Sequence, residues 1–541
     1  MTTKTRRLLL ATVPLALMMA APAAAQTLRI GLASEPTAFD PHFHNLGPNN
    51  QVRMHVFEGL TKADENQRTV PSLATEWEAV DDTTWVFRLR EGVTFSNGNE
   101  FTAQDVIYTI CRVPTVENSP SSFTSFVAGI QSIEVDENDP LTITFTTDGP
   151  VPLLPTNFAS VGILSAAVFG GEDAVFTPDG CENMGTPPQV NDFIDPANAV
   201  GTGPYKLERF VRGDQLVLVR NEDHWEGTPT WERVVKRPIA NQGARVAALL
   251  AGDVDVIETP PIQDFDRIRG AGNKIAEGLS NRVIYLHLDQ NPEEGHVPPG
   301  VSGTDGRNPF TDVRVREAIS IAVNRQAIVD RIMGGLALPA GELLPYPMFG
   351  TTENAPVDPY DPDRARQLLA EAGFPNGFSV TLFTPNDRYM NDERISQAIA
   401  QMLARVGIAT DVDAMTASTF FSRRNQFEFG FWLAGWGAAT GEMSSPLIAL
   451  VATRDPDTGM GSTNRQRYSN PEIDALIMAA TRTVDPEARE ELLQRASRMA
   501  MDDYGTIPLH IEVTPWAFAA NLELTPRADQ YTLAMDVVPA N

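Results

Sequence analysis

The sequence predicts an α/β fold, and its 541 residues are enough for roughly three or four domain-sized units. Between residues 308 and 413, segments with helical periodicity alternate with short apolar strands, the pattern of a sheet covered by helices. Residues 205–219 place two apolar strands around the turn Arg212-Gly213-Asp214 and predict a β-hairpin. Residues 282–288, RVIYLHL, are apolar on both faces and predict a fully buried strand.

The N-terminus has the organisation of a secretory signal peptide. Lys4, Arg6 and Arg7 precede an apolar run at 8–20, and the alanines at 23–25 form a small-residue cleavage site. The apolar run is shorter than the ~20 residues that span a bilayer comfortably. No later run is long and apolar enough to cross a membrane. We therefore expect an exported mature chain that is not inserted in the membrane.

The composition is acidic. The net charge of −28 becomes −31 when the segment 1–25, with its three basic residues, is removed. Such a field repels nucleic acid and anionic lipid, so neither is an expected partner. Two cysteines, Cys111 and Cys181, remain for an oxidising compartment and are predicted to form a disulfide. Two buried free thiols are the alternative.

The first half of the chain contains mostly strands. A strand begins at Thr27, and residues 51–60 predict a helix that leads into a turn. Thr102 is placed to cap a helix whose apolar positions include Val106 and Ile110. Further strands are expected at 85–89, 130–135 and 141–146 and in the 205–219 hairpin, followed by a helix and a strand within 243–256.

The second half has the alternation of βαβ units. Asp361-Pro362 supplies an N-cap with proline at the first helical position, and Gly373 ends that helix. Strands at 379–383 and 408–412 flank a helix at 395–406, so parallel pairing with a right-handed crossover is expected. Other expected elements are a helix at 315–322, helices that start at Asn470-Pro471 and Asp485-Pro486, and a strand at 506–513.

Several stretches of the chain match a known family in their amino-acid sequence. They are VFEGL at 56–60, the segment 71–110 that begins PSLATEWEAV, GTGPYKLERF…LVLVRNEDHWEG at 201–227, and RVAALLAGDVDV at 245–256. Together they resemble the extracytoplasmic solute-binding proteins of family 5, the peptide and nickel class of receptors for ATP-binding-cassette importers. The resemblance covers essentially the whole mature chain.

The resemblance implies a periplasmic protein of the type II, cluster C architecture, with two α/β lobes that close on a ligand like a hinge. An additional α+β subdomain is inserted in lobe 1. It implies a monomer that passes its ligand to an inner-membrane permease with ATPase subunits, without cofactor or metal. The expected division is signal peptide 1–25, lobe 1 at 26–58, 198–284 and 506–541, inserted subdomain 59–197, and lobe 2 at 285–505.

The resemblance also places the ligand site at residues 427–446, FEFGFWLAGWGAATGEMSSP. In peptide-binding members, the loop after this Gly-Trp carries an Asp that pairs with the α-ammonium of the peptide. The matching residue here is Ala439, and Leu433 stands where some oligopeptide receptors have Arg. A buried ammonium without a carboxylate is strongly destabilised. The ligand therefore either lacks that amine or meets Glu35 or Glu442.

Other cleft residues are expected on both lobes. Trp436 is expected to form a stacking wall, with core packing as the alternative. Arg388 or Arg394 can hold an anionic group near a helix N-terminus, with local pairing on the surface as the alternative. The further candidates are Gly435, Gly437 and Tyr389 on lobe 2, and Asn45, Asn50 and Tyr205 on lobe 1.

The resemblance favours di- or oligopeptides as ligands, with opine-like or modified amino acids, oligosaccharides and metal chelates as rivals. His42 and His44 can share an ion, but no further ligand spacing completes a metal site, and contact with an organic ligand is preferred. The chain has no GxSxG, HExxH, P-loop or GxGxxG motif, so an enzyme is not expected. A secreted hydrolase and a periplasmic chaperone stay as minor alternatives.

Overall fold

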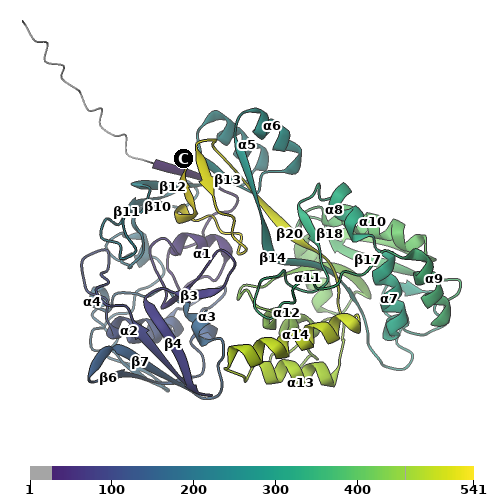
Figure 1. Cartoon of the computed structure of the whole chain (residues 1–541), viewed down its shortest axis with the longest axis horizontal. Coiled ribbons are helices and arrows are strands. Elements are labelled where there is room, and N and C mark those ends of the chain that lie inside the picture. Colours follow the sequence, from purple (N-terminus) through teal and green to yellow (C-terminus); the bar gives the residue numbers. More distant parts are fainter. Residues whose placement is uncertain (1–26, 457, 541) are drawn as a thin grey trace, which may run out of the picture.

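The computed structural model describes residues 27–456 and 458–540, so the predicted signal peptide lies outside the described residues. The chain forms two bodies that are joined by a pair of long strands (Figure 1). These strands, β14 (Lys274–Leu288) and β20 (Ile507–Phe518), are antiparallel neighbours. Both predicted strands in these regions are confirmed, and both are longer than expected because each continues from one body into the other.

The first body, called lobe 1 here, contains one end of a large twisted sheet. Strand β1 (Thr27–Leu32) pairs in parallel with β12 (Arg233–Pro238) and β13 (Val256–Glu258). The predicted hairpin is confirmed as β10 (Tyr205–Val211) and β11 (Gln215–Arg220). The sheet order runs β10-β11-β12-β1-β13-β20-β14 and continues into the second body. Helices α5 (Gln242–Ala251) and α6 (Phe265–Gly270) complete this region.

One predicted helix differs from the structure. Instead of covering 51–60, helix α1 spans Gly47–Arg53. The chain leaves the helix because its backbone is used elsewhere: the His55 carbonyl accepts the Tyr205 N–H at 2.9 Å, and the Val56 carbonyl accepts the Gly203 N–H at 2.9 Å. A Cβ on Gly203 would lie 2.7 Å from both carbonyl oxygens, so only glycine permits this approach.

A separate antiparallel sheet lies beside lobe 1, at the lower left of Figure 1. Its order is β4 (Ala74–Asp81), β5 (Thr84–Leu89), β7 (Asp139–Thr147) and β6 (Ile130–Asp136). Helix α2 (Ala103–Arg112) follows Thr102, as predicted, and the Asp105 carboxylate accepts the Thr102 N–H at 2.8 Å. The predicted disulfide is present: Cys111 of α2 is bonded to Cys181 of β9 (Gly180–Glu182), with their Cα atoms 5.7 Å apart.

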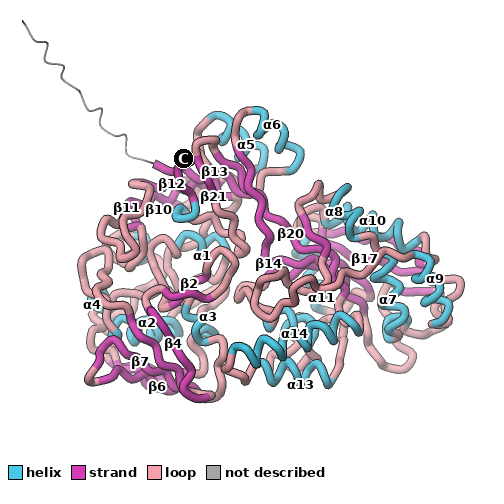
Figure 2. Tube along the Cα trace, in the orientation of Figure 1, coloured by secondary structure: helices cyan, strands magenta, loops and turns pink. Residues whose placement is uncertain are grey.

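The second body, lobe 2, has the predicted βαβ unit. Strands β17 (Phe378–Pro385) and β18 (Ile408–Met415) are parallel, with α10 (Asp392–Ala404) between them in sequence. Strand β19 (Phe431–Gly437) pairs with β14 and thereby joins this part of the sheet to the long strands. Figure 2 shows helices around these strands, and α13 and α14 beneath them. The helices are α7 (Val313–Ala322), α8 (Arg325–Arg331), α9 (Pro362–Glu371), α11 (Ala417–Asn425), α13 (Pro471–Ala480) and α14 (Pro486–Asp502).

The predicted helix starts of lobe 2 are confirmed by their caps. The side chains of Asp361, Asn470 and Asp485 each accept a backbone N–H in the first turn of α9, α13 and α14. The remaining short elements are β2 (Thr61–Ala63), β3 (Thr69–Pro71), α3 (Leu154–Phe158), α4 (Ala166–Phe169), β8 (Val175–Thr177), β15 (Val301–Ser302), β16 (Ala337–Pro339), α12 (Ser444–Pro446), β21 (Leu522–Leu524) and β22 (Val537–Pro539).

Each body buries its own apolar residues. Lobe 1 packs Ile30, Phe57 and Leu218 into one core, and the separate sheet packs Phe87 and Phe145 into another. In lobe 2, the core between α7, α9, α10 and the sheet is distinct from the core beneath α13 and α14. Within residues 27–456 and 458–540, no helix combines the length and the apolar character that a bilayer span requires.

Replacing both Cys111 and Cys181 with serine should destabilise the region around the separate sheet. The two residues are 70 positions apart, and a loop of this length gives a stabilisation of about 4 kcal/mol on the chain-entropy model. Urea unfolding followed by circular dichroism measures the change. The wild type with reductant should show the same loss as the double variant, and an unchanged unfolding midpoint in both samples would contradict the prediction.

Candidate functional site

A cavity of about 240 Å³ lies between the two lobes, beside the long strands. Both lobes contribute to its walls: α1 and the β2–β3 hairpin from lobe 1, and the loop after β19 from lobe 2. The long strand β14 and the C-terminal segment 529–531 contribute as well. A site that is built from both lobes and from the strands between them can respond to their relative movement.

An irregularity in the long strands supplies two of the cavity residues. Leu279 of β14 faces Val513 of β20, but Val283 faces Ile511, so the β14 side has two additional residues over this interval. Such a bulge bends the strand and redirects its side chains. It places Asn281 and Arg282 in the cavity wall.

Asn281 connects the three parts of the chain that meet here. Its side-chain amide donates to the Ala438 carbonyl at 3.0 Å, and its backbone carbonyl accepts the Ala438 N–H at 3.1 Å. Its backbone N–H donates to the Ala528 carbonyl at 2.9 Å. The loop that follows β19 and the C-terminal segment are therefore both held to the same residue of β14.

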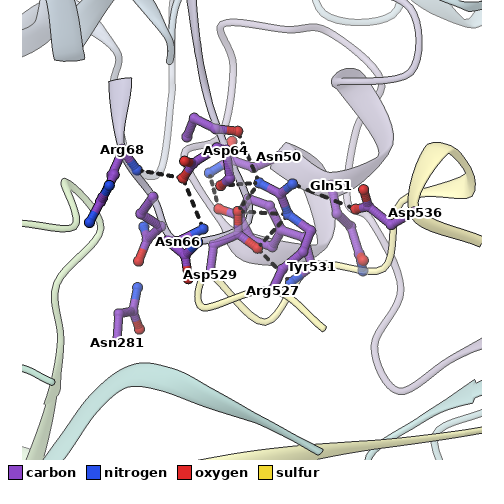
Figure 3. A network of polar contacts seen from close by, with 12 residues as sticks. Asn50, Gln51, Asp64, Asn66, Arg68, Asn281, Arg527, Asp529, Tyr531 and Asp536 are labelled. Atoms are coloured by element: carbon purple, nitrogen blue, oxygen red, sulfur yellow. Dashed lines mark hydrogen bonds and ion pairs between the residues drawn. The ribbon is translucent and has the colours of Figure 1, made fainter. Parts of the chain in front are cut away.

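A polar network supports the lobe 1 wall (Figure 3), and its members Asn50, Asp529 and Tyr531 line the cavity. Arg527 binds Asp529 through Nε at 3.1 Å and Nη2 at 2.7 Å, and donates to the Asp64 carbonyl at 3.0 Å. The Asn50 amide donates to the Tyr531 hydroxyl at 3.2 Å. Burial raises the pKa of Tyr531, with the Asp529 carboxylate acting in the same direction, so the phenol keeps its hydrogen and can donate it to a ligand.

The two lobes touch at the edge of the cavity. The Gln67 side-chain amide of the β2–β3 hairpin donates to the Ala439 carbonyl of lobe 2 at 3.1 Å. The contact is close, since a Cβ added to Gly441 would lie 2.5 Å from the Gln67 Cβ. The Gln67 Oε1 and Thr440 Oγ1 atoms are buried without a hydrogen-bond partner in the described chain. Both are available to a ligand, because buried polar atoms are normally paired.

A second, larger cavity of about 730 Å³ adjoins the first. The two share Gln67, Thr69, Thr156 and Thr440 in their walls. The larger one continues between the separate sheet and α14, past Trp77 and Trp85 on one side and Phe349 and Arg489 on the other. The space between the lobes is thus long enough to extend beyond the Gln67 contact.

Four of the residues predicted from the sequence are brought together in the smaller cavity: Asn45, Asn50, Gly437 and Ala439. Gly437 lies beside the Arg282 guanidinium, since a Cβ there would be 3.2 Å from Nη2. Gly435 is instead covered by Tyr389, whose hydroxyl donates to the Gly435 carbonyl at 3.1 Å.

Trp436 and the two predicted carboxylates are placed differently. Trp436 is half-buried against the core beneath α13 and α14, donates to Ser445 Oγ at 3.1 Å, and is absent from the walls of both cavities. Glu442 borders the larger cavity, but Arg489 binds both of its oxygens. Glu35 is exposed, accepts the Gly213 N–H, and also lines neither cavity.

The remaining predicted residues lie outside both cavities. Arg388 and Arg394 are exposed around the start of α10, and the Arg388 backbone N–H donates to Asp392. Tyr205 is 1% exposed within the lobe 1 core. His42 is fully buried, with Nε2 on the Gly162 carbonyl and Nδ1 on Arg112, whereas His44 contacts Thr37 through Nδ1.

Sequence reasoning missed the residues that carry charge in the smaller cavity. They are Arg53 at the end of α1, Arg282 in the bulge, and Asp529. Arg53 had a signal in the sequence, because it is a charged residue within the otherwise apolar and polar-neutral run QVRMHVF. Arg282 had none, since a bulge between distant strands leaves no local pattern.

The comparisons with known proteins agree with this geometry. Residues 68–457 match the model of the bacterial extracellular solute-binding proteins, family 5. The chain belongs to this family. Its members are binding proteins, so the predicted class, a solute-binding protein and not an enzyme, is confirmed.

Relatives of this solute-binding protein cover almost its whole length. The glutathione-binding protein GsiB of Escherichia coli K12 is 28% identical over 517 residues, which are 94% of this chain and 93% of that protein. The structure of HbpA2 from Haemophilus parasuis matches with a TM-score of 0.78 at 22% identity, over 95% of this chain and 100% of that one. The open form of the murein tripeptide-binding protein MppA matches with a TM-score of 0.77 at 23% identity, over 96% and 98%. The predicted fold class, a type II binding protein, is confirmed.

The buried ion pair between Glu442 and Arg489 leads to a prediction about stability. Its side chain and that of Arg489 are both 6% exposed, so Glu442→Gln leaves a buried guanidinium without a counter-ion. The expected loss is about 3–5 kcal/mol in the free energy of unfolding, measured by urea denaturation without ligand. Glu371→Gln breaks the exposed pair with Arg364 and is the control, with an expected change below about 1 kcal/mol. Equal losses in the two variants would contradict the structural role of Glu442.

Proposed function

We propose that this protein is the periplasmic substrate-binding component of an importer, and that it captures a small peptide or peptide-like solute between its lobes. The observation that carries the proposal is the composition of the cavity wall. Asn50, Gln67, Asn281 and Tyr531 come from separate segments, and their amide and hydroxyl groups lie in the wall of one cavity between the lobes. Amides suit the N–H and C=O groups of peptide bonds, which need both donors and acceptors.

Capture requires the ligand to favour the closed arrangement of the lobes. Changing an open-to-closed ratio from 99:1 to 1:99 needs a preference of about 10⁴-fold, or roughly 5.5 kcal/mol. A solute that contacts Asn50 of lobe 1 and the 437–440 loop of lobe 2 gains contacts only when both lobes are near. A solute held by a single lobe has no such preference and leaves the ratio unchanged.

The remaining parts of the proposal concern organisation and partners. The domain boundaries proposed from the sequence are kept, with the subdomain at 59–197 inserted in lobe 1. The signal peptide is removed near Ala25, and the mature protein is a monomer in the periplasm. It delivers its ligand to an inner-membrane permease that is driven by ATPase subunits. Support for a peptide-like ligand comes from the relatives, one of which is named for glutathione and another for a murein tripeptide.

Gly441 tests whether ligand binding depends on closure. Its φ is +66°, and any Cβ there meets Gln67 of the other lobe. Gly441→Ala should weaken the binding of whichever solute stabilises the wild type by at least about 10-fold, because the closed arrangement is disfavoured. The affinity is measured by isothermal titration calorimetry, and closure by the fall in the radius of gyration in small-angle X-ray scattering.

Gly459→Ala is the matched control. Gly459 has a similar φ of +77° but open space around it, so the backbone strain is comparable and the contact between lobes is missing. This control should bind and close like the wild type. Wild-type affinity in Gly441→Ala, or ligand binding with no change in the radius of gyration, would contradict capture by closure.

A further inference from the structure

The charges around the smaller cavity are unusual for so acidic a chain. The net charge is −28, yet the charged residues in the cavity wall are two arginines, Arg53 and Arg282, and a single carboxylate, Asp529. Asp529 is already neutralised by Arg527, which contacts both of its oxygens, and the Tyr531 N–H occupies Oδ1 as well. Apart from this pair, the charge that faces the ligand space is positive.

Arg53 is the stronger of the two positive groups. The residue is 5% exposed, and its Nε donates to Asn50 Oδ1 at 3.3 Å. The guanidinium carbon lies 5.6 Å from the centre of the Phe123 ring. Within residues 27–456 and 458–540, neither Nη atom has a hydrogen-bond partner and no carboxylate forms an ion pair with Arg53. A buried guanidinium is normally paired, so its missing partner points to a ligand.

The contacts of Arg53 direct its charge to the space between the lobes. Arg53 also borders a hollow in lobe 1, but its hydrogen-bond partner Asn50 lines only the cavity between the lobes. Tyr531, whose hydroxyl accepts a hydrogen bond from the same Asn50 side chain, lines the same cavity. Burial lowers the pKa of Arg53 to about 10, so the guanidinium remains charged at neutral pH despite the loss of water.

Arg282 adds a second positive group, and its contact with a carboxylate of the protein is long. It approaches Glu512 of β20 with Nε 3.5 Å from Oε2, which is longer than a normal charged hydrogen bond. The other Glu512 oxygen accepts the Met390 N–H at 3.3 Å. The Arg282 Nη2 atom lies beside Gly437 at the cavity, where a ligand can reach it.

Among the described residues, none that lines the same cavity offers a free carboxylate for an ammonium group. The loop position that matches the amine-binding Asp of peptide receptors is Ala439, and its carbonyl is occupied by Gln67. The two carboxylates that the sequence suggested for a ligand amine do not serve either. Arg489 binds Glu442, and Glu35 lies outside the cavity. A free α-ammonium would therefore meet Arg53 and Arg282 in a site with no counter-ion.

We infer that the ligand is a carboxylate whose acidic group binds Arg53, with Arg282 beside it, and whose nitrogen, if it has one, is substituted or points out of the cavity. This inference rests on the proposed function, because it names the chemical class of solute taken by the same cavity. Suitable classes are peptides that enter with the carboxyl end first and N-substituted amino acids. The guanidinium supplies two parallel N–H groups to the carboxylate.

The test compares acids with their amides. A thermal-shift screen of peptides, N-substituted amino acids, dicarboxylates and neutral sugars first finds the solutes that raise the melting temperature of the wild type. Each carboxylate that binds is then titrated by calorimetry next to its carboxamide and, where it has an amine, next to its N-acetylated form. The inference requires that the binders are carboxylates, that amidation weakens binding about 100-fold or more, and that N-acetylation changes it little. It is overturned if no carboxylate binds, or if amides bind as well as acids.

Arg53→Met provides an independent test. Methionine retains the apolar stem and removes a charge that has no partner in the protein, so the melting temperature without ligand should stay the same or rise. Affinity for the acid should fall about 100-fold or more, while the weak affinity for its amide should not change. Arg209→Met removes an exposed arginine of lobe 1 outside the cavity and should bind like the wild type. Unchanged acid affinity in Arg53→Met would overturn the inference.

The outcomes separate this inference from the proposed function. If a neutral solute binds and shrinks the radius of gyration, and Arg53→Met has no effect, the capture mechanism stands and the carboxylate assignment fails. If the acid binds through Arg53 without any change in the radius of gyration, the assignment stands and capture by closure fails. The acid–amide comparison needs no variant, so it remains decisive even if Arg53→Met does not fold.

Discussion

The pairing of β14 with β20 is the constraint on which the rest of the molecule depends. These two strands are the backbone connection that runs through both bodies, and they also carry the middle of the large sheet. The bulge in β14 lies beside the cavity between the lobes. It interrupts the regular ladder there and places Asn281 and Arg282 in the wall of the ligand space. The irregular part of the long strands therefore lies directly at the ligand space.

The electrostatics of the protein work on two length scales. The overall negative charge is spread over a solvated surface, where salt screens it beyond about 8–10 Å. Arg53 acts at contact distance in a space that water leaves when the lobes approach, and charge interactions there are much stronger. An unpaired buried cation is unfavourable in the empty protein. The unpaired guanidinium also makes the protein select for a matching anion, because solutes without an anionic group leave it unpaired.

Much of the fold was predictable from local patterns, and the ligand site was not. The hairpin at Tyr205–Arg220, the capped helices after Asp361, Asn470 and Asp485, and the Cys111–Cys181 bond all follow from neighbouring residues or from composition. The predicted boundary of α1 is wrong because the backbone carbonyls of residues 55 and 56 accept hydrogen bonds from residues 205 and 203, about 150 positions away in the sequence. Trp436 was expected in the ligand space because the family resemblance places the ligand site at residues 427–446, but strand alternation places its ring with the core side chains of Trp432 and Ala434. Arg53, Arg282 and Asp529 meet only through tertiary structure.

The contact between Gln67 and Ala439 has a further implication. Gln67 binds the main-chain carbonyl of residue 439 and not its side chain. Any amino acid at this position presents the same oxygen, so this hydrogen bond between the lobes does not depend on which side chain faces the ligand. Selectivity for new solutes can therefore evolve at position 439 while the mechanical coupling of the two halves is inherited unchanged.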